Sequence, residues 1–166
     1  MVAGELHLCI WFNRACNYNF FKKFFSLVSW LGDGKFWYSL MLALPFVYGE
    51  AGISASLQMA MVGVAGLIVY KLIKAHTHRL RPFAVNQDIN LGTSPLDQYS
   101  FPSGHTLHAV SFTIIASSCF PELAWLLIPV TLLIALSRVV LGLHYPSDVG
   151  IGALIGSSLA SLSLQL

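Results

Sequence analysis

Charged side chains are scarce in this sequence. Its 166 residues include 9 Lys and Arg and 7 Asp and Glu, so 10% of the chain is charged, against about 25% for an ordinary soluble domain. Hydrophobic residues make up 56%. This length allows about five membrane crossings at ~20 residues each, with little left for a separate soluble unit. The composition therefore predicts an integral membrane protein that forms one domain over residues 1–166.

Other shortages narrow the class of function. The formal net charge of +2 is too small to indicate a nucleic-acid partner. Cysteines are few and odd in number, and the spacing of Cys9, Cys16 and Cys119 matches no metal site. We interpret all three as small apolar packing residues. The N-terminus has no basic region followed by an apolar core, so we expect no cleavable signal peptide.

Long apolar runs fill most of the chain instead. They predict an all-α, polytopic membrane helix bundle of about five transmembrane helices, with its helical core over residues 35–166. The expected spans are residues 35–48, which could begin further upstream, 51–70, 106–120, 123–141 and 145–166.

Residues 1–31 differ from these spans because polar and basic side chains alternate with aromatic ones. This amphipathic pattern is typical of a segment at the membrane surface, and it also fits a helix packed on the rest of the protein. Gly32-Asp33-Gly34 is expected to break the helix before the core begins.

The five expected spans place most polar residues at one membrane face. The ends near Lys35 and at residues 71–81, 103–105 and 138–148 share this face, whereas the turns at 49–52 and 121–122 lie at the other. The one long hydrophilic connection, residues 75–102, also belongs to the polar face. A loop of this length in a compact protein is commonly functional or disordered.

The segment Pro102-Ser103-Gly104-His105 has the pattern of a helix start at the end of this loop. Ser103 is a suitable N-cap, and the free N–H groups and positive dipole end of a first helical turn bind anions. His105 would place a proton donor beside the anion. Taken alone, a Ser-Gly helix start is common and weakly informative.

Three cations are expected near this helix start. Lys74 and Arg81 are seven residues, or two turns, apart, so both can project to one side if the helix persists to Pro82. They could equally be interfacial cations whose heads extend to water. Arg138 interrupts an apolar run, where a charge is unfavourable by several kcal/mol unless it faces a polar cavity.

His144 and Asp148 form the last group. Pro146 can start a helix, and Asp148 in its first turn can reach back to His144. A carboxylate on one ring nitrogen fixes the tautomer and leaves the other nitrogen as a nucleophile. In isolation the pair could be a capping Asp and an interfacial His. Together with the three cations, the helix start and His105, it indicates a phosphate site.

These groups, in this order and spacing, resemble the three-part signature of the type-2 phosphatidic acid phosphatase and vanadium haloperoxidase superfamily. The matching motifs are Lys74-x6-Arg81-Pro82, Pro102-Ser103-Gly104-His105 and Ser137-Arg138-x5-His144-x3-Asp148. The resemblance covers roughly residues 51–165. It implies a phosphatase that needs neither a metal nor another cofactor and that forms a phosphohistidine intermediate.

The resemblance also implies a role for each motif residue. His144 would be the nucleophile, Asp148 would orient it, and His105 would protonate the leaving oxygen and then activate water. The phosphoryl oxygens would be held by Lys74, Arg81, Ser103, the backbone N–H of Gly104 and Arg138. Four further histidines match no motif position: His7, His76, His78 and His108.

The substrate implied is a lipid phosphate or diphosphate in the bilayer. Members similar to this chain act on undecaprenyl diphosphate, phosphatidic acid, phosphatidylglycerophosphate or lipid A phosphates. The short loops favour a bacterial polyprenyl diphosphate or phospholipid phosphatase, with a lipid A 1-phosphatase-type enzyme as the alternative. A vanadate-dependent haloperoxidase-like protein is disfavoured by the apolar spans, and a non-catalytic lipid-binding protein by the presence of His105 and His144. The sequence does not indicate an oligomeric state.

Two observations conflict over which side of the inner (plasma) membrane the site faces. The resemblance implies an extracytoplasmic site, which is our expectation. All 9 Lys and Arg, however, lie on the active-site face or in the N-terminal region joined to it, and the positive-inside rule would put that face in the cytoplasm. The chain also departs from the common six-span members, because residues 1–31 replace a clear first span.

Overall fold

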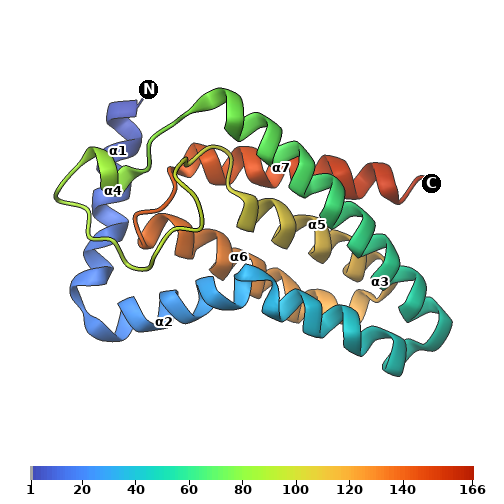
Figure 1. Ribbon diagram of the computed structural model, residues 1–166. Helices are drawn as coiled ribbons and strands as arrows, with labels where there is room; N and C mark the ends of the chain where they lie inside the picture. The colour runs from blue at the N-terminus through green and yellow to red at the C-terminus, as the bar shows by residue number, and fades with distance from the viewer. Residues whose placement is uncertain (1) are drawn as a thin grey trace.

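The computed structural model describes the backbone of residues 2–166 and the side chains of residues 4–166, and it confirms the expected all-α fold (Figure 1). The α-helices are α1 (Val2–Asn13), α2 (Asn19–Trp30), α3 (Phe36–Thr77), α4 (Pro82–Val85), α5 (Gly104–Cys119), α6 (Ala124–Val140) and α7 (Pro146–Ser163). Two 3₁₀ segments, η1 (Arg14–Asn17) and η3 (Pro121–Leu123), and a π-helical turn, η2 (Leu31–Lys35), connect some of them.

Helix α3 is a helical hairpin whose two arms, residues 36–48 and 50–77, meet at a turn and diverge from it (Figure 1). The chain reverses at Gly49, which has φ 57° and ψ −131°, a conformation that only glycine adopts easily. The arms are tightly packed next to the turn, because a Cβ on Gly52 would lie 2.1 Å from the Leu44 carbonyl oxygen. The expected end of a span at residues 49–50 is therefore confirmed.

The expected helix break at residues 32–34 is confirmed. Gly34 has φ 113° and ψ −23°, outside the helical region, so α2 and the first arm of α3 are two helices that meet at a kink. The kink falls between residues 31 and 35, where we expected the boundary between the amphipathic segment and the core. At 1.5 Å per residue, the two helices together span roughly 45 Å along the chain from residue 19 to residue 48, more than the ~30 Å hydrocarbon core of a bilayer.

Two stretches, residues 19–77 and 121–140, are long and apolar enough to cross a membrane. The first is interrupted at Gly34 and Gly49 and contains both arms of α3. Helix α2 packs against α6 and buries Phe25 and Ser29, which confirms the packing that its amphipathic pattern allowed. Its other face leaves Phe20 and Trp30 exposed.

Helix α5 lies at the centre of the bundle, in contact with α3, α6 and α7. Two glycines let α7 approach α5 backbone to backbone. A Cβ on Gly152 would lie 2.5 Å from the Ser103 carbonyl oxygen, and one on Gly156 would lie 2.3 Å from that of Leu107. Small residues allow this close packing between helices in membranes. The contact fixes the start of α5 against the start of α7.

The two ends of the bundle differ in the way the sequence predicts. At one end the α3 hairpin turn meets the α5–α6 turn, where Tyr48 donates a hydrogen bond to Glu122 (2.7 Å) and stacks on Phe120. At the other end lies the long loop from residue 78 to 103, together with the starts of α5 and α7 (Figure 1). The structure thus confirms that the polar segments collect at one end.

The close approach of α7 to α5 gives a stability prediction. Gly156→Ala should lower the free energy of unfolding by about 1–3 kcal/mol, because its Cβ cannot fit against the Leu107 carbonyl. Gly150→Ala is the matched control on the same helix, since a Cβ there meets nothing within 4 Å and alanine favours helix. Thermal unfolding in detergent micelles measures both. Equal unfolding temperatures for the two variants would contradict the packing described.

Candidate active site

Lys74 and Arg81 converge as expected, but not along one helix. Helix α3 ends at Thr77, His78 takes a left-handed conformation, and Arg81 stands in extended backbone before Pro82. The prediction that helical spacing aligns the two cations is therefore wrong. They meet because the loop returns and both contact the carboxylate of Asp97.

Asp97 connects the two cations closely. Its carboxylate oxygens lie 2.8 and 2.9 Å from Lys74 Nζ, and Oδ1 lies 2.7 Å from Arg81 Nη2. Partial burial alone would raise the pKa of Asp97, but the hydrogen bonds and charges of Lys74 and Arg81 outweigh it and hold this pKa below its ordinary value. The carboxylate thus stays ionised between two groups suited to phosphate. Sequence reasoning missed Asp97, because only the general importance of the loop pointed to it.

The start of α5 has the expected cap. The Ser103 hydroxyl accepts the backbone N–H of Thr106 (3.4 Å) and lies 3.0 Å from the Thr106 hydroxyl. Ser103 is fully buried and is not among the residues that line the cavity beside it, whereas Gly104 and His105 do line it. The hydroxyl of Ser103 therefore serves the helix cap, and the expected contact of Ser103 with phosphate is not supported by its position.

Arg138 faces the cavity, as its place in an apolar run predicts. Its side chain is buried at 2% exposure, and its Nη1 donates a short hydrogen bond to the hydroxyl of Ser29 on α2. Within residues 4–166, Arg138 Nε is buried without a hydrogen-bond partner. A buried guanidinium with spare donors is strongly favourable to an anion.

His144 lies in the connection between α6 and α7, beside Arg81. Arg81 Nη1 is 3.3 Å from His144 Nε2, and since a guanidinium can only donate, Nε2 accepts and the ring proton sits on Nδ1. Burial, together with the charges of Arg138, Arg81 and Lys74, lowers the pKa of His144 well below its ordinary value. An unprotonated Nε2 therefore points toward the cations at neutral pH.

Asp148 is close to His144 but makes its hydrogen bonds elsewhere. Its Oδ2 lies 3.7 Å from His144 Nδ1, longer than a hydrogen bond, and accepts the backbone N–H of Tyr145 at 2.8 Å. Its Oδ1 accepts from Arg79 Nη1 at 2.6 Å. The expected pairing of Asp148 with the Nδ1 side of His144 is therefore a near contact that a shift of under 1 Å would close.

Arg79 and Glu5 were missed as site residues. Arg79 is held by Glu5 of α1 (3.2 Å) and stacks on the ring of Tyr145 (4.0 Å), so it is fixed where it neutralises Asp148. Glu5 also accepts a 2.6 Å hydrogen bond from the hydroxyl of Ser147. The sequence offered no signal for this cluster, since Arg79 had the pattern of an interfacial cation.

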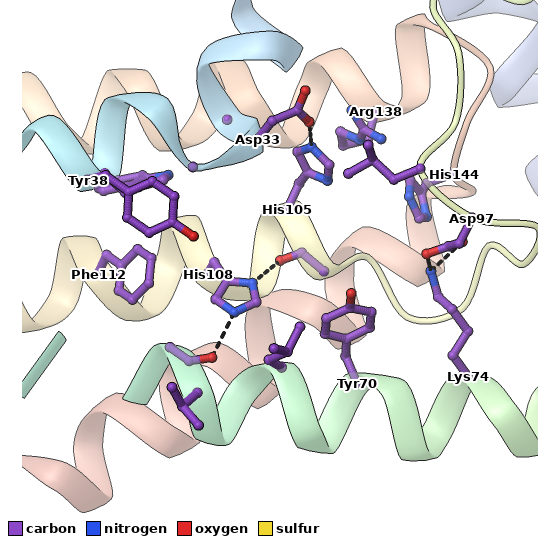
Figure 2. A pocket seen from close by; sticks show the side chains of 18 of the residues that line it. Asp33, Tyr38, Tyr70, Lys74, Asp97, His105, His108, Phe112, Arg138 and His144 are labelled. Carbon is purple, nitrogen blue, oxygen red and sulfur yellow. Dashed lines mark hydrogen bonds and ion pairs between the residues drawn. The ribbon is translucent and has the colours of Figure 1, made fainter. Parts of the chain in front are cut away.

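A second carboxylate contacts His105. Asp33 Oδ1 lies 2.5 Å from His105 Nε2, and Figure 2 shows the pair on the side of the cavity formed by η2, with Arg138 and His144 beyond it. Sequence reasoning treated Asp33 only as part of a helix break. Its role could not be predicted because the partner lies 72 residues away.

One cavity of about 440 Å³ lies between these elements, polar at one end and apolar at the other (Figure 2). Lys74, Arg81, Arg138, His105 and His144 line the polar end. The apolar part is lined by side chains of α3 and α5: Trp37, Met41, Ala60, Val64, Leu67 and Phe112.

The histidines outside the motifs have other roles. His108 sits in the apolar part, with Nδ1 2.8 Å from the Gly104 carbonyl oxygen and Nε2 3.0 Å from that of Gly63, so it ties α5 to α3. His76 and His78 are exposed and do not line the cavity.

Comparisons with known proteins give one family. Residues 54–166 match the PAP2 superfamily model. An undecaprenyl-diphosphatase of Sulfolobus acidocaldarius is 36% identical over 105 residues, which cover 62% of this chain and 50% of the relative.

Two solved structures share the fold. Aquifex aeolicus LpxE matches with a TM-score of 0.84 and 26% identity, over 97% of this chain and 94% of that one. A transmembrane PAP2-type phosphatidylglycerolphosphate phosphatase of Bacillus subtilis matches with a TM-score of 0.80 and 21% identity, over 98% and 84%. The chain spans about half the length of the curated relatives it matches.

The position of Asp97 generates a prediction on anion affinity. In Asp97→Asn the charge that competes for Lys74 and Arg81 is gone, so inorganic phosphate should bind roughly 3- to 10-fold more tightly, or about 0.7–1.4 kcal/mol. Because the pKa of Asp97 is lowered, the carboxylate is ionised across roughly pH 5–8 and protonates only as pH falls further, so the difference should be constant over that range.

Calorimetric titration with phosphate provides the measurement. Asp88→Asn is the control, since Asp88 lies exposed in the same loop and does not line the cavity. Weaker phosphate binding in Asp97→Asn would show that the carboxylate is needed to hold the cations in place, contrary to the competition described.

Proposed function

The chain belongs to the PAP2 superfamily and has the fold of its transmembrane members, and from this premise we propose that it hydrolyses the terminal phosphate of a membrane lipid phosphate or diphosphate. The reaction proceeds without a metal ion, through a phosphohistidine intermediate. The protein crosses the membrane with about five helical passes, formed by α2 with the first arm of α3, the second arm of α3, α5, α6 and α7.

One observation carries this proposal: the cavity is amphiphilic in the manner of a lipid phosphate. Three cations and two histidines surround one end, and a hydrocarbon-lined channel between α3 and α5 leads away from it. A soluble phosphate ester would leave that channel without a suitable occupant. A phosphate with an isoprenoid or acyl chain fills both parts, since burial of the chain is favourable by about 0.8 kcal/mol per CH₂.

In the first step His144 attacks the phosphorus. Its Nε2 is unprotonated because burial and the neighbouring cations keep its pKa low. As the Nε2–P bond forms and the P–O bond to the leaving group breaks, His105 gives a proton to the leaving oxygen. Lys74, Arg81 and Arg138 neutralise the charge on the transferring group, with the backbone N–H of Gly104 at the positive end of α5.

In the second step water replaces His144 on the phosphorus. His105, now neutral, takes a proton from the water while its oxygen bonds to phosphorus and the Nε2–P bond breaks. Free phosphate leaves and both histidines return to their starting forms. Asp148 approaches His144 Nδ1 from 3.7 Å and stabilises the ring while Nε2 carries phosphorus, and the ion pair with Arg79 holds the Asp148 carboxylate in place.

We assign a polyprenyl diphosphate, of which undecaprenyl diphosphate is the model compound, as the preferred substrate. The similarity to an undecaprenyl-diphosphatase supports it, because that relative is 36% identical to this chain over 105 residues. Phosphatidic acid and phosphatidylglycerophosphate are the competing substrates.

The test of the function is phosphate release in detergent micelles with a chelator present. The wild type should release phosphate from undecaprenyl diphosphate faster than from phosphatidic acid or phosphatidylglycerophosphate. His144→Ala should lower kcat by at least roughly 10³-fold at every pH, because no other group replaces the nucleophile. His76→Ala, at an exposed histidine outside the cavity, is the matched control and should equal the wild type.

Two outcomes would refute the proposal in different ways. A folded wild type that releases no phosphate from any of the three lipids is not a lipid phosphatase. Substantial turnover by His144→Ala would leave the activity in place but remove His144 as the nucleophile.

We place the active site on the extracytoplasmic face of the inner (plasma) membrane. In a Cys119→Ser background, Asp88→Cys in the active-site loop should react with a membrane-impermeant maleimide in intact cells. Glu50→Cys, at the α3 hairpin turn, should react only after lysis. Cys9 and Cys16 are buried and give little background. The reverse pattern would place the site in the cytoplasm, as the distribution of Lys and Arg indicates.

A further inference from the structure

His105 is held by a carboxylate that lies outside the region matched by the family model. Asp33, in η2, contacts His105 Nε2 at 2.5 Å, and both side chains line the cavity. His105 is only 10% exposed and Asp33 25%, so water screens the contact little. The contact between the carboxylate and the imidazole is therefore treated as a charge-assisted hydrogen bond inside the cavity.

The backbone of η2 is shaped so that Asp33 reaches His105. Gly34, directly after Asp33, has φ 113°, a conformation that glycine adopts easily, so the helix is interrupted next to Asp33. Here the turn packs directly on its target, because a Cβ on Gly32 would lie 3.4 Å from His105 Cδ2 and 3.0 Å from Ile134. A Cβ at position 32 would therefore press on the Ile134 side chain and touch the His105 ring.

The same segment serves a second site residue. Ser29, one turn before Asp33, accepts the hydrogen bond from Arg138. Residues four apart on a helix share a face, so α2 and η2 present a hydroxyl to the phosphate-facing arginine and a carboxylate to the acid–base histidine. A segment that merely packed on the bundle would have no need of polar groups at these two positions.

We propose that Asp33 is the positioning residue of His105, holding its Nε2–H so that Nδ1 is the nitrogen that exchanges protons with the substrate. This inference rests on the proposed function. The proton stays on His105 Nε2 in both steps, hydrogen-bonded to the Asp33 carboxylate, and is never transferred to it. Its charge stabilises the imidazolium needed in the first step and the one formed again in the second.

Proton movement in both steps stays balanced. In the first step the proton on Nδ1 passes to the leaving oxygen, while the hydrogen bond to Asp33 fixes the ring. In the second step Nδ1 takes one proton from the attacking water. Without Asp33, either ring nitrogen could carry the single proton of neutral His105. In molecules with the proton on Nδ1, that nitrogen could not accept a proton from water.

The other charged and titratable groups around His105 oppose its protonation. Arg138 on α6 and His144 in the connection between α6 and α7 face His105 from neighbouring elements, and His108 lies one turn further along α5. The charge of Arg138 disfavours a positive His105. Asp33 is the group that offsets them. Loss of its charge should therefore make His105 give up its proton at lower pH.

The experiment compares Asp33→Asn, Asp33→Glu and wild type on whichever of the three lipids the wild type hydrolyses fastest. Asp33→Asn should lower kcat by roughly 10- to 100-fold, a part of the effect of a full general acid–base. KM and the inhibition constant of inorganic phosphate should stay within about twofold, since Asp33 does not hold phosphate. The alkaline limb of the kcat profile should move to lower pH, and Asp33→Glu should restore its position.

A double-mutant cycle separates positioning from packing. In a His105→Ala background, Asp33→Asn should cause no further loss of kcat, because its effect passes through the histidine. Glu50→Gln is the control for removing a carboxylate, since Glu50 is exposed at the far end of the bundle, and it should match wild type. An additive loss, an unmoved alkaline limb, or failure of Asp33→Asn to fold would overturn the proposal in favour of a structural role.

The failure of this inference differs from failure of the function. If the wild type releases no phosphate, the lipid phosphatase activity is rejected and the role of Asp33 with it. If the wild type and Glu50→Gln turn over normally and Asp33→Asn equals them in rate and pH profile, only the role of Asp33 is rejected.

Discussion

The structure depends on three cations buried together in a chain with very little charge. Each of the three cations, Lys74, Arg81 and Arg138, is under 10% exposed. Removing a charged group from water is unfavourable by several kcal/mol unless anions or dipoles replace the lost hydration. Asp97, Ser29 and the carbonyl oxygen of Leu143 supply part of that replacement. In the function that we propose, a phosphate supplies the rest. The same three buried charges that destabilise the empty bundle therefore favour an anion in its cavity.

The packing of α5 against α7 fixes the relative position of the segments that carry the two histidines. Gly152 and Gly156 seat α7 against the backbone of α5, which fixes the segment containing His144 relative to the start of α5 and His105. Reactive groups on separate helices must be held within fractions of an ångström to act together. Ser103 caps the N-terminus of α5 and a capping box at Tyr145 caps the N-terminus of α7. Both helices therefore start beside the histidines, His105 and His144.

The sequence predicts what depends on composition and local spacing. Apolar runs place most helices, Pro102 and Pro146 mark two helix starts, and the three motifs identify Arg81, Arg138 and the two histidines as one cavity's lining. It cannot predict contacts made by returning loops or distant segments. Three charged residues have no local pattern and contact the site through distant partners. Asp97 contacts Lys74, 23 residues away, Arg79 contacts Asp148, 69 residues away, and Asp33 contacts His105, 72 residues away. The helix break at Gly34 was predictable, because the glycines at 32 and 34 give a local signal.

Contacts from the first 35 residues reach the signature motifs. The signature motifs lie within residues 54–166, yet Glu5, Ser29 and Asp33 touch Ser147, Arg138 and His105. Residues outside the family-model region must therefore dock on residues inside it before the charged groups of the cavity acquire their partners. A fragment limited to residues 54–166 would carry the whole signature and still lack the carboxylate beside His105 and the hydroxyl beside Arg138.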